Sequence, residues 1–173
     1  QVDPAALFEF QKGRSVIYES DNRTSCLVEM DEEPPHPLNR EAVGIVLTVA
    51  LMVGARPLDE VHVMRKTVID GSNTTGFQRT CAIALNGEIT VEGKTIPIQH
   101  TSLEEDAARK SGEREGKTIK YRIDRLGIPL IEVTTAPVLH SPEEAEKTAL
   151  AIGRILRATG KVKRGLGTIR QDL

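Results

Sequence analysis

The feature that most limits the fold of this chain is a series of short apolar runs, rich in Val, Ile and Thr, that turn residues separate. The runs occur at residues 60–69, 77–85, 88–91, 95–99, 119–124 and 129–134. Most are too short for an ordinary helix, and β-branched residues favour strands. We therefore predict a sheet of mainly antiparallel strands, with Asn86-Gly87 and Gly93 as hairpin turns.

Three segments carry residues that start helices. Asp3, Asn39 and Ser141 each stand directly before a stretch of helix-forming residues, where a capping side chain is expected. A further strand pair is predicted at residues 16–19 and 25–30, around a polar turn. Because strands dominate over helices, the expected fold class is α+β with an antiparallel sheet.

The charge balance limits the partners that the chain can have. The 173 residues include 23 Lys and Arg against 25 Asp and Glu, a net charge of -2. Binding driven by nucleic-acid phosphates normally needs a strong basic excess, which argues against a general nucleic-acid coat. A local basic strip remains compatible with this balance.

Cysteine usage and hydropathy point to a cytoplasmic protein without a membrane anchor. Cys26 and Cys81 show no CxxC spacing, so neither a zinc site nor a disulfide framework is indicated. The longest apolar stretch, residues 42–55, is too short and too interrupted by Gly to span a bilayer. No basic-then-apolar leader opens the chain.

A set of carboxylates is the first candidate for chemistry. Glu104, Glu105 and Asp106 are consecutive, while Glu132 lies inside a strand run and Asp172 follows a basic segment. A carboxylate within a strand run is costly unless it meets a cation, a donor cluster or a metal, and such oxygens suit Mg²⁺. The alternative is that the consecutive acids form a solvated turn and that Glu132 pairs with a nearby Arg. The residues alone leave both open.

Two glycine-rich polar stretches are the second candidate. Residues 161–170 place four cations around two glycines, so that backbone N–H and side-chain groups can approach an anion. Residues 70–80 form a second polar stretch, preceded by Arg65 and Lys66. Residues 161–170 have neither the spacing of a Walker A motif nor that of a dinucleotide fingerprint. Each stretch is equally compatible with an ordinary loop.

Several long motifs together resemble those of one protein family. DGSNTTGFQRT (70–80), LEEDAAR (103–109), YRIDRLGIPLIEV (121–133), the SPEEA helix start and KVKRGLGTIRQD (161–172) stand in the order seen in the GatB/GatE family. The first and last of these are similar to the archaeal E type rather than to the bacterial B type. The resemblance extends over essentially the whole chain.

The resemblance implies a fold and an activity. The family's catalytic domain is similar to glutamine synthetase, with an antiparallel sheet that forms a cradle. The implied reaction converts Glu-tRNA(Gln) to Gln-tRNA(Gln): ATP and Mg²⁺ serve to phosphorylate the side-chain carboxylate, and ammonia then displaces the phosphate. For the E type, a separate asparaginase-like D subunit supplies the ammonia, and the full complex is expected to be a dimer of heterodimers.

The resemblance also implies roles for individual residues. The expected metal ligands are Glu105, Glu132 and Asp172, with Glu104 as a further candidate. The catalytic assignment is to Glu105, Glu132 and Arg170. The candidates for contacts with nucleotide phosphates or substrate are Lys163, Arg164 and Arg170 and, with less support, Lys66 and Arg79.

Two departures from the family pattern shape the expectations for this chain. The family's first strand, whose Glu and His are expected to complete the metal site, and its later tRNA-binding domains have no counterpart in residues 1–173. We therefore expect these residues to be part of a single catalytic domain that is inactive alone. Two alternatives stay open: another ATP-dependent carboxylate-amine ligase of glutamine-synthetase type that acts on a small molecule, and a noncatalytic scaffold subunit.

Overall fold

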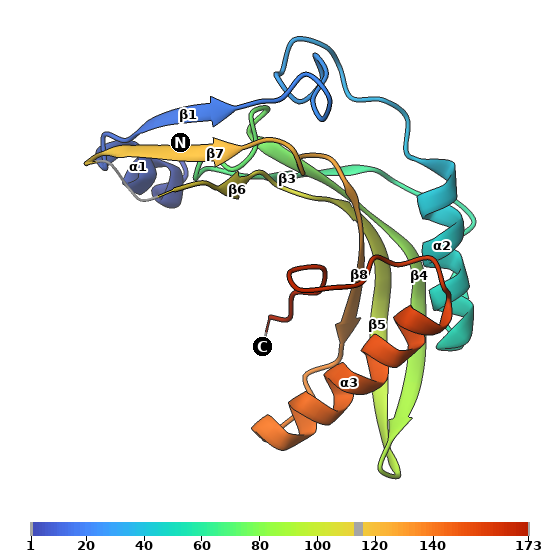
Figure 1. Ribbon diagram of the computed structural model, residues 1–173. Helices are drawn as coiled ribbons and strands as arrows, with labels where there is room; N and C mark the ends of the chain where they lie inside the picture. The colour runs from blue at the N-terminus through green and yellow to red at the C-terminus, as the bar shows by residue number, and fades with distance from the viewer. Residues whose placement is uncertain (1, 113–115, 173) are drawn as a thin grey trace. The chain divides into compact units, whose positions relative to one another are not determined.

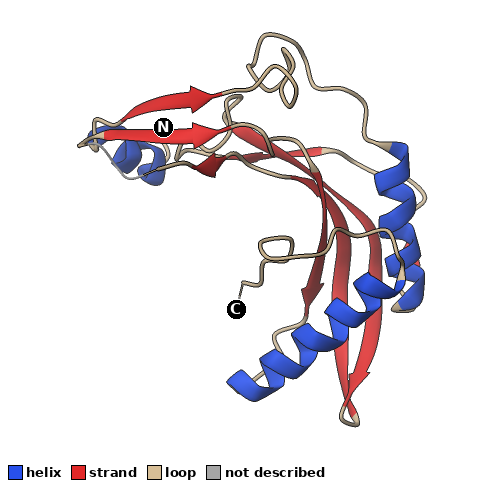
Figure 2. Cartoon of the chain, viewed as in Figure 1, coloured by secondary structure: helices blue, strands red, loops and turns tan. Residues whose placement is uncertain are grey.

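The computed structural model describes residues 2–112 and 116–172, and its described part contains three helices and eight strands (Figures 1 and 2). The helices are α1 (Pro4–Gln11), α2 (Arg40–Met52) and α3 (Pro142–Ala158). The strands are β1 (Ser15–Glu19), β2 (Arg56–Pro57), β3 (Met64–Thr67), β4 (Phe77–Val91), β5 (Lys94–Glu105), β6 (Arg109–Lys110), β7 (Thr118–Arg122) and β8 (Pro129–Thr135). This confirms the α+β class, with sheets in which antiparallel pairs are frequent.

The chain divides into two compact units, each assembled from three stretches of sequence. Unit 1 comprises Gln1–Leu38, Val63–Thr80 and Glu104–Leu130. Unit 2 comprises Asn39–His62, Cys81–Leu103 and Ile131–Leu173. Strands β4, β5 and β8 therefore contribute residues to both units. That residues 1–173 belong to one catalytic domain stays a prediction.

Unit 1 contains a three-stranded sheet in the order β1-β7-β6 (Figure 1). Strand β7 pairs in parallel with β1 and antiparallel with β6. Tyr121 of β7 and Ile123 just after it are each 1% exposed and form the core of the unit with Ala108. Val16, Ile119 and Leu126 pack against that core.

The predicted pairing of residues 16–19 with residues 25–30 is wrong. The first run is β1, but its partner is β7 and not the segment that follows it. Residues 27–30 instead form turns, which Glu29 stabilises because its carboxylate accepts a 2.6 Å hydrogen bond from the Cys26 N–H. Burial favours a higher pKa for Glu29, but the hydrogen bonds from Cys26 outweigh it and the net pKa is lowered.

Unit 2 packs its two helices and its strands around one apolar cluster. The buried members of the cluster are Ala50, Val53, Ala55, Ala84, Ile89, Ile96 and Ile98, and Ala151, Ile152 and Ile155 of α3 pack against them. Within this unit β2 pairs with β4, and β4 and β5 form the hairpin that turns at Glu92 and Gly93. Both turn residues have positive φ, 50° and 81°, as the predicted hairpin requires.

The second predicted hairpin turn, at Asn86-Gly87, is wrong because β4 continues through it. Asn86 adopts a positive φ of 61°, but Gly87 is buried against the end of α2. A Cβ atom at Gly87 would lie 2.8 Å from the Val53 carbonyl oxygen, which also accepts a hydrogen bond from Glu88 N–H. This glycine therefore permits a close approach of helix and strand rather than a reversal of the chain.

The predicted helix caps are confirmed. Asp3 accepts hydrogen bonds from the N–H groups of residues 5 and 6, Asn39 from residue 42, and Ser141 from Glu144. Glu144 in turn pairs with Lys94 at 2.7 Å and so connects α3 to the β4–β5 hairpin of the same unit. Hydrogen bonding from Lys94 lowers the Glu144 pKa. Within the described residues, no helix combines the length and apolar character needed to cross a membrane.

Candidate functional site

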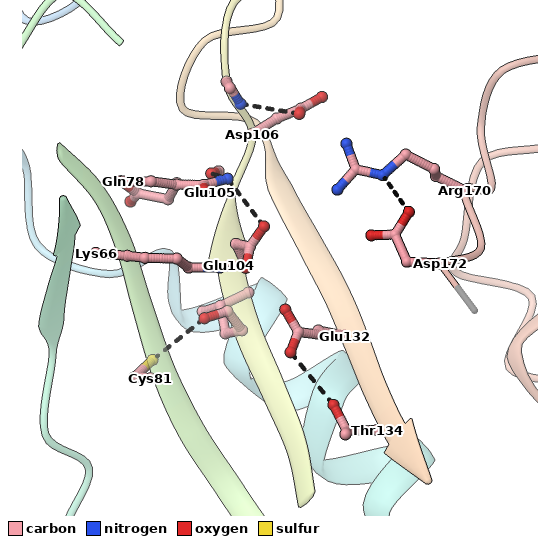
Figure 3. A network of polar contacts seen from close by, with 12 residues as sticks. Lys66, Gln78, Cys81, Glu104, Glu105, Asp106, Glu132, Thr134, Arg170 and Asp172 are labelled. Atoms are coloured by element: carbon pink, nitrogen blue, oxygen red, sulfur yellow. Dashed lines mark hydrogen bonds and ion pairs between the residues drawn. The ribbon is translucent and has the colours of Figure 1, made fainter. Parts of the chain in front are cut away.

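A polar cluster of unit 1 surrounds two of the predicted carboxylates, at the end of β5 (Figure 3). We call it the carboxylate network; its members are Lys66, Gln78, Arg79, Glu104 and Glu105. Strand β3 supplies Lys66, β4 supplies Gln78 and Arg79, and β5 supplies the two acids. Pairing of β3 with β4 places Lys66 opposite Gln78, so the polar side chains come from adjoining strands.

Glu104 is buried, with 5% of its surface exposed. Its carboxylate accepts hydrogen bonds from Lys66 Nζ at 2.7 Å and from Gln78 Nε2 at 2.9 Å. A buried carboxylate without partners would be strongly destabilising, and these contacts supply the required charge and donors. The alternative of a solvated turn is therefore wrong for Glu104, because the residue lies within a strand and away from water.

Glu105 forms a two-point ion pair with Arg79. Arg79 Nε donates to Glu105 Oε2 at 2.8 Å, and Arg79 Nη2 contacts the other carboxylate oxygen. The two side chains are only 14% and 22% exposed. Gln78 connects both acids, since its Nε2 also donates to the Glu105 carbonyl oxygen at 2.7 Å. The predicted substrate contacts of Lys66 and Arg79 stay predictions, and both cations are engaged by carboxylates here.

Glu132 lies in unit 2, on β8, and is partly exposed. Its Oε1 is 3.6 Å from His100 Nε2, on the neighbouring strand β5, and accepts a 3.3 Å hydrogen bond from Thr134 (Figure 3). These neighbours can orient the carboxylate while leaving part of it open to solvent. Sequence reasoning placed Glu132 in a strand correctly but provided no signal for His100.

The predicted basic segment has a different character. Residues 159–172 form no helix or strand, and Lys163, Arg164 and Arg170 are exposed. Arg170 and Asp172 form a 3.6 Å ion pair with each other, and both side chains are more than 80% exposed. The charges predicted to act on phosphates are thus present, but no regular element fixes them.

The four predicted metal ligands divide between the two units. Glu104 and Glu105 belong to unit 1, whereas Glu132 and Asp172 belong to unit 2. Across residues 2–112 and 116–172, no group of three or more His, Cys, Asp or Glu side chains is placed to hold a metal ion. Their oxygen donors are of the type that Mg²⁺ prefers, yet the described residues do not by themselves make a metal site. The metal-ligand assignment stays a prediction.

Two tyrosines to which the sequence analysis assigned no role hold the loop before β4. Tyr121 donates a 3.1 Å hydrogen bond to the Asp70 carbonyl oxygen, and Tyr18 donates a 2.6 Å bond to that of Gly71. Gly71 has a φ of 86°, and a Cβ atom there would lie 2.9 Å from the Val16 side chain. Burial, followed by the Asp70 charge, raises the pKa of Tyr121 to about 12. The loop that leads to Gln78 and Arg79 is therefore anchored to the sheet of unit 1.

These observations define an α+β protein whose strands carry neutralised carboxylates at a sheet end. Comparison with known families then gives the particular family: the chain belongs to the GatB/GatE catalytic domain family, whose model matches residues 9–173. This confirms the resemblance seen in the motifs.

Individual relatives agree with the family assignment. Over 172 residues the chain is 66% identical to the E subunit of glutamyl-tRNA(Gln) amidotransferase from Aeropyrum pernix, covering 99% of this chain and 27% of that protein. Identity to the E subunit from Sulfolobus acidocaldarius is 61%, and to that from Saccharolobus solfataricus 57%, each over 173 residues, 100% of this chain and 27% of the relative. The chain thus spans about a quarter of the length of these relatives.

Proposed function

We propose that this chain is the catalytic part of a tRNA-dependent amidotransferase subunit, folded as a glutamine-synthetase-like cradle. The observation that carries the proposal is the match to the GatB/GatE catalytic domain over residues 9–173. The relatives named above are E subunits of a glutamyl-tRNA(Gln) amidotransferase, and their names support the same substrate. We also propose a cytoplasmic location, as for other translation enzymes.

The proposed reaction has two steps. In the first, an oxygen of the glutamate side chain on Glu-tRNA(Gln) forms a bond to the γ-phosphorus of ATP, and the bond between the β- and γ-phosphates breaks to release ADP. In the second, ammonia attacks the acyl carbon, and inorganic phosphate and a proton leave to give the amide. A free carboxylate is a poor electrophile, which is why the oxygen must first become part of a leaving group.

We assign Glu132 to the reaction itself because it is a partly exposed strand carboxylate whose neighbours His100 and Thr134 can orient it. The carboxylate network has a different proposed role. Its paired charges hold the ends of β3, β4 and β5 of unit 1 in register, and Arg79 fixes the direction of the Glu105 carboxylate. ATP and Mg²⁺ are proposed requirements of the longer protein.

The proposed partners follow from the same family membership. An asparaginase-like D subunit would release ammonia from an amide donor and pass it to this subunit, in a complex that we propose to be a dimer of heterodimers. Glu-tRNA(Gln) would bind mainly through domains other than this one. The 173-residue chain alone is proposed to be inactive; amidation by the isolated chain with free ammonia and Glu-tRNA(Gln) would contradict that.

The test uses the longer protein with its ammonia-producing partner and measures conversion of Glu-tRNA(Gln) to Gln-tRNA(Gln). We expect Glu132→Gln to lower amidation by at least about hundredfold, as loss of a catalytic carboxylate does, while the partner's amidase activity persists. Glu88→Gln is the matched control, because Glu88 is an exposed acid on β4 of the same unit. Near-normal amidation by Glu132→Gln would remove Glu132 from the site.

Two further measurements test the alternative functions, a small-molecule ligase and a noncatalytic scaffold. Amidation of free glutamate in place of Glu-tRNA(Gln) would identify a small-molecule ligase. Absence of Mg²⁺-dependent ATP binding, measured by calorimetry, would identify a noncatalytic scaffold. Either result, with no Gln-tRNA(Gln) formed, would overturn the proposed function.

A further inference from the structure

The three-stranded sheet β1-β7-β6 of unit 1 (Figure 1) has a charged residue at matching positions on each strand. In the strand register Glu19 of β1 lies beside Arg122 of β7, and Arg122 lies opposite Arg109 of β6. Residues that pair in this way share a face of the sheet, on strands about 4.8 Å apart. We call Glu19, Arg122 and Arg109 the arginine row.

Two arginines directly opposite each other repel unless an anion lies between them. Asp124 has this role: its Oδ2 is 2.7 Å from Arg109 Nη2 and 3.3 Å from Arg122 Nη2. One carboxylate balances only one of the two guanidinium charges. Asp124 and Glu19 together offset the two guanidinium charges, so the excess positive charge at this place comes from Lys110. Each guanidinium carries five N–H donors and therefore retains donor capacity.

The arginine row opens into a shallow hollow of about 420 Å³. Its lining residues are Glu19, Arg109, Lys110, Ser111, Gly112 and Arg122. The side chains of Arg109 and Arg122 are each about half exposed, which leaves them accessible to a ligand. Glu19 is the acidic member of the lining, and it is held by a 2.6 Å hydrogen bond from Ser111 Oγ.

The lining selects a class of ligand. Arginine and lysine donors suit phosphate oxygens, and Arg binds them with its planar fork of N–H groups. Among the described residues, the lining contains no apolar or aromatic side chain on which a nucleobase could stack. A phosphate whose base points elsewhere fits this hollow, as in a nucleic-acid backbone, whereas a mononucleotide would leave its base without a contact.

We propose that Arg109, Lys110 and Arg122 of unit 1 bind backbone phosphates of RNA. The choice of RNA rests on the proposed function, in which the substrate is an aminoacyl-tRNA. The net charge of -2 is compatible with such a site, because Arg109, Lys110 and Arg122 line one hollow. In contrast to the largely exposed segment 161–172, the paired strands β6 and β7 fix the backbone of Arg109 and Arg122 before any ligand arrives, which lowers the entropy cost of binding.

The test measures binding of a fluorescein-labelled RNA hairpin to the 173-residue chain by anisotropy, at several salt concentrations. We expect the double variant Arg109→Gln, Arg122→Gln to bind the RNA about tenfold or more weakly. The plot of log K against log salt has a negative slope, and we expect its magnitude to decrease by about 1 for each phosphate that the variant no longer neutralises. Arg154→Gln, an exposed Arg on α3, is the control with the same type of charge change. It should leave both quantities unchanged.

Two single variants keep the test informative if the double variant is unstable. Lys110→Gln leaves both Asp124 ion pairs intact and should weaken binding by about fivefold. Glu19→Gln removes the acid from the lining and should strengthen binding by about twofold. Thermal unfolding of each variant checks that the sheet remains folded.

Several outcomes would overturn the proposal. If Lys110→Gln and the double variant bind RNA as the unsubstituted chain does, with the same salt slope, the arginines are only structural partners of Asp124. If ATP displaces the RNA when the two supply the same concentration of phosphate groups, the hollow is a nucleotide site. Because this assay needs neither amidation nor ATP turnover, failure of RNA binding and failure of the proposed function are distinguishable.

Discussion

Two Arg–carboxylate pairs, both assigned by sequence to one active site, differ in their surroundings. Arg79 and Glu105 form two contacts between strands, with side chains 14% and 22% exposed. Arg170 and Asp172 form one 3.6 Å contact in a segment without regular structure, with side chains more than 80% exposed. The two ion pairs should therefore contribute very differently to the free energy of unfolding, because water screens the second pair and is largely excluded from the first.

The largest effect is expected from breaking the buried pair. Arg79→Met should lower the free energy of unfolding by about 2 kcal/mol, because it leaves the Glu105 carboxylate without its cation. The loss is smaller than for a fully buried pair, because the Glu105 carboxylate is only partly buried. Urea unfolding followed by circular dichroism measures this. The double variant Arg79→Met, Glu105→Gln should recover at least half of the loss. A loss below about 0.5 kcal/mol for Arg79→Met would show that the pair is energetically like the exposed one.

A smaller effect is expected at the loop that precedes the buried pair. Tyr121→Phe removes the hydroxyl that donates to Asp70 O and should cost about 1 kcal/mol, a typical value for one hydrogen bond. The same urea titration measures it. Tyr121 is 1% exposed, so a loss near zero would mean that the hydroxyl does not hold the loop.

The same substitution should change the alkaline pH dependence. The pKa of Tyr121 is about 12 in the folded chain, against 10.0 for the ordinary phenol. As pH rises between these values the unfolded chain releases a proton that the folded chain keeps, so stability falls with rising pH. Tyr121→Phe should reduce this fall between about pH 10 and pH 12, the window that the two pKa values set. An unchanged slope would contradict the raised pKa.

The smallest effect is expected at the exposed pair. Asp172→Asn should change the free energy of unfolding by no more than about 0.5 kcal/mol, because an exposed ion pair contributes little against water and salt. Differential scanning calorimetry at low and high salt measures it. A loss above about 1 kcal/mol would mean that the segment around residue 172 is ordered by contacts stronger than this ion pair.

How much of the fold the sequence predicts depends on the range of the interactions. The caps Asp3, Asn39 and Ser141 and the turn at Gly93 were predictable because each acts within a few residues. Asn86-Gly87 has the same local signal, but the close approach of Gly87 to Val53, the residue that follows α2, decides its structure. The partner of β1 likewise depends on pairing with a distant strand, which local patterns do not encode.

In the candidate site, too, the local features were predictable from the sequence and the long-range contacts were not. Glu132 was identifiable as unusual because an acid in a strand run needs a compensating partner, whereas Glu104 and Glu105 were noted only as consecutive acids and through the family resemblance. The partners themselves, Gln78 and His100, were not identifiable, since amides and imidazoles occur widely on surfaces and their distances to the acids depend on strand pairing. Sequence reasoning can therefore nominate the charges of a site more readily than the neighbours that orient them.

The discontinuity of the two units has a consequence for how the chain forms. The β1–β7 pairing joins residues 15–19 to residues 118–122, so the first helix and strand leave the ribosome long before the strand that completes their sheet. Pairings between such distant segments close slowly because the intervening loop must first be ordered. Since each unit draws on three stretches of sequence, truncation at any position removes part of at least one of them. Substitutions in the whole chain, rather than shortened pieces, are therefore the means by which either unit can be studied.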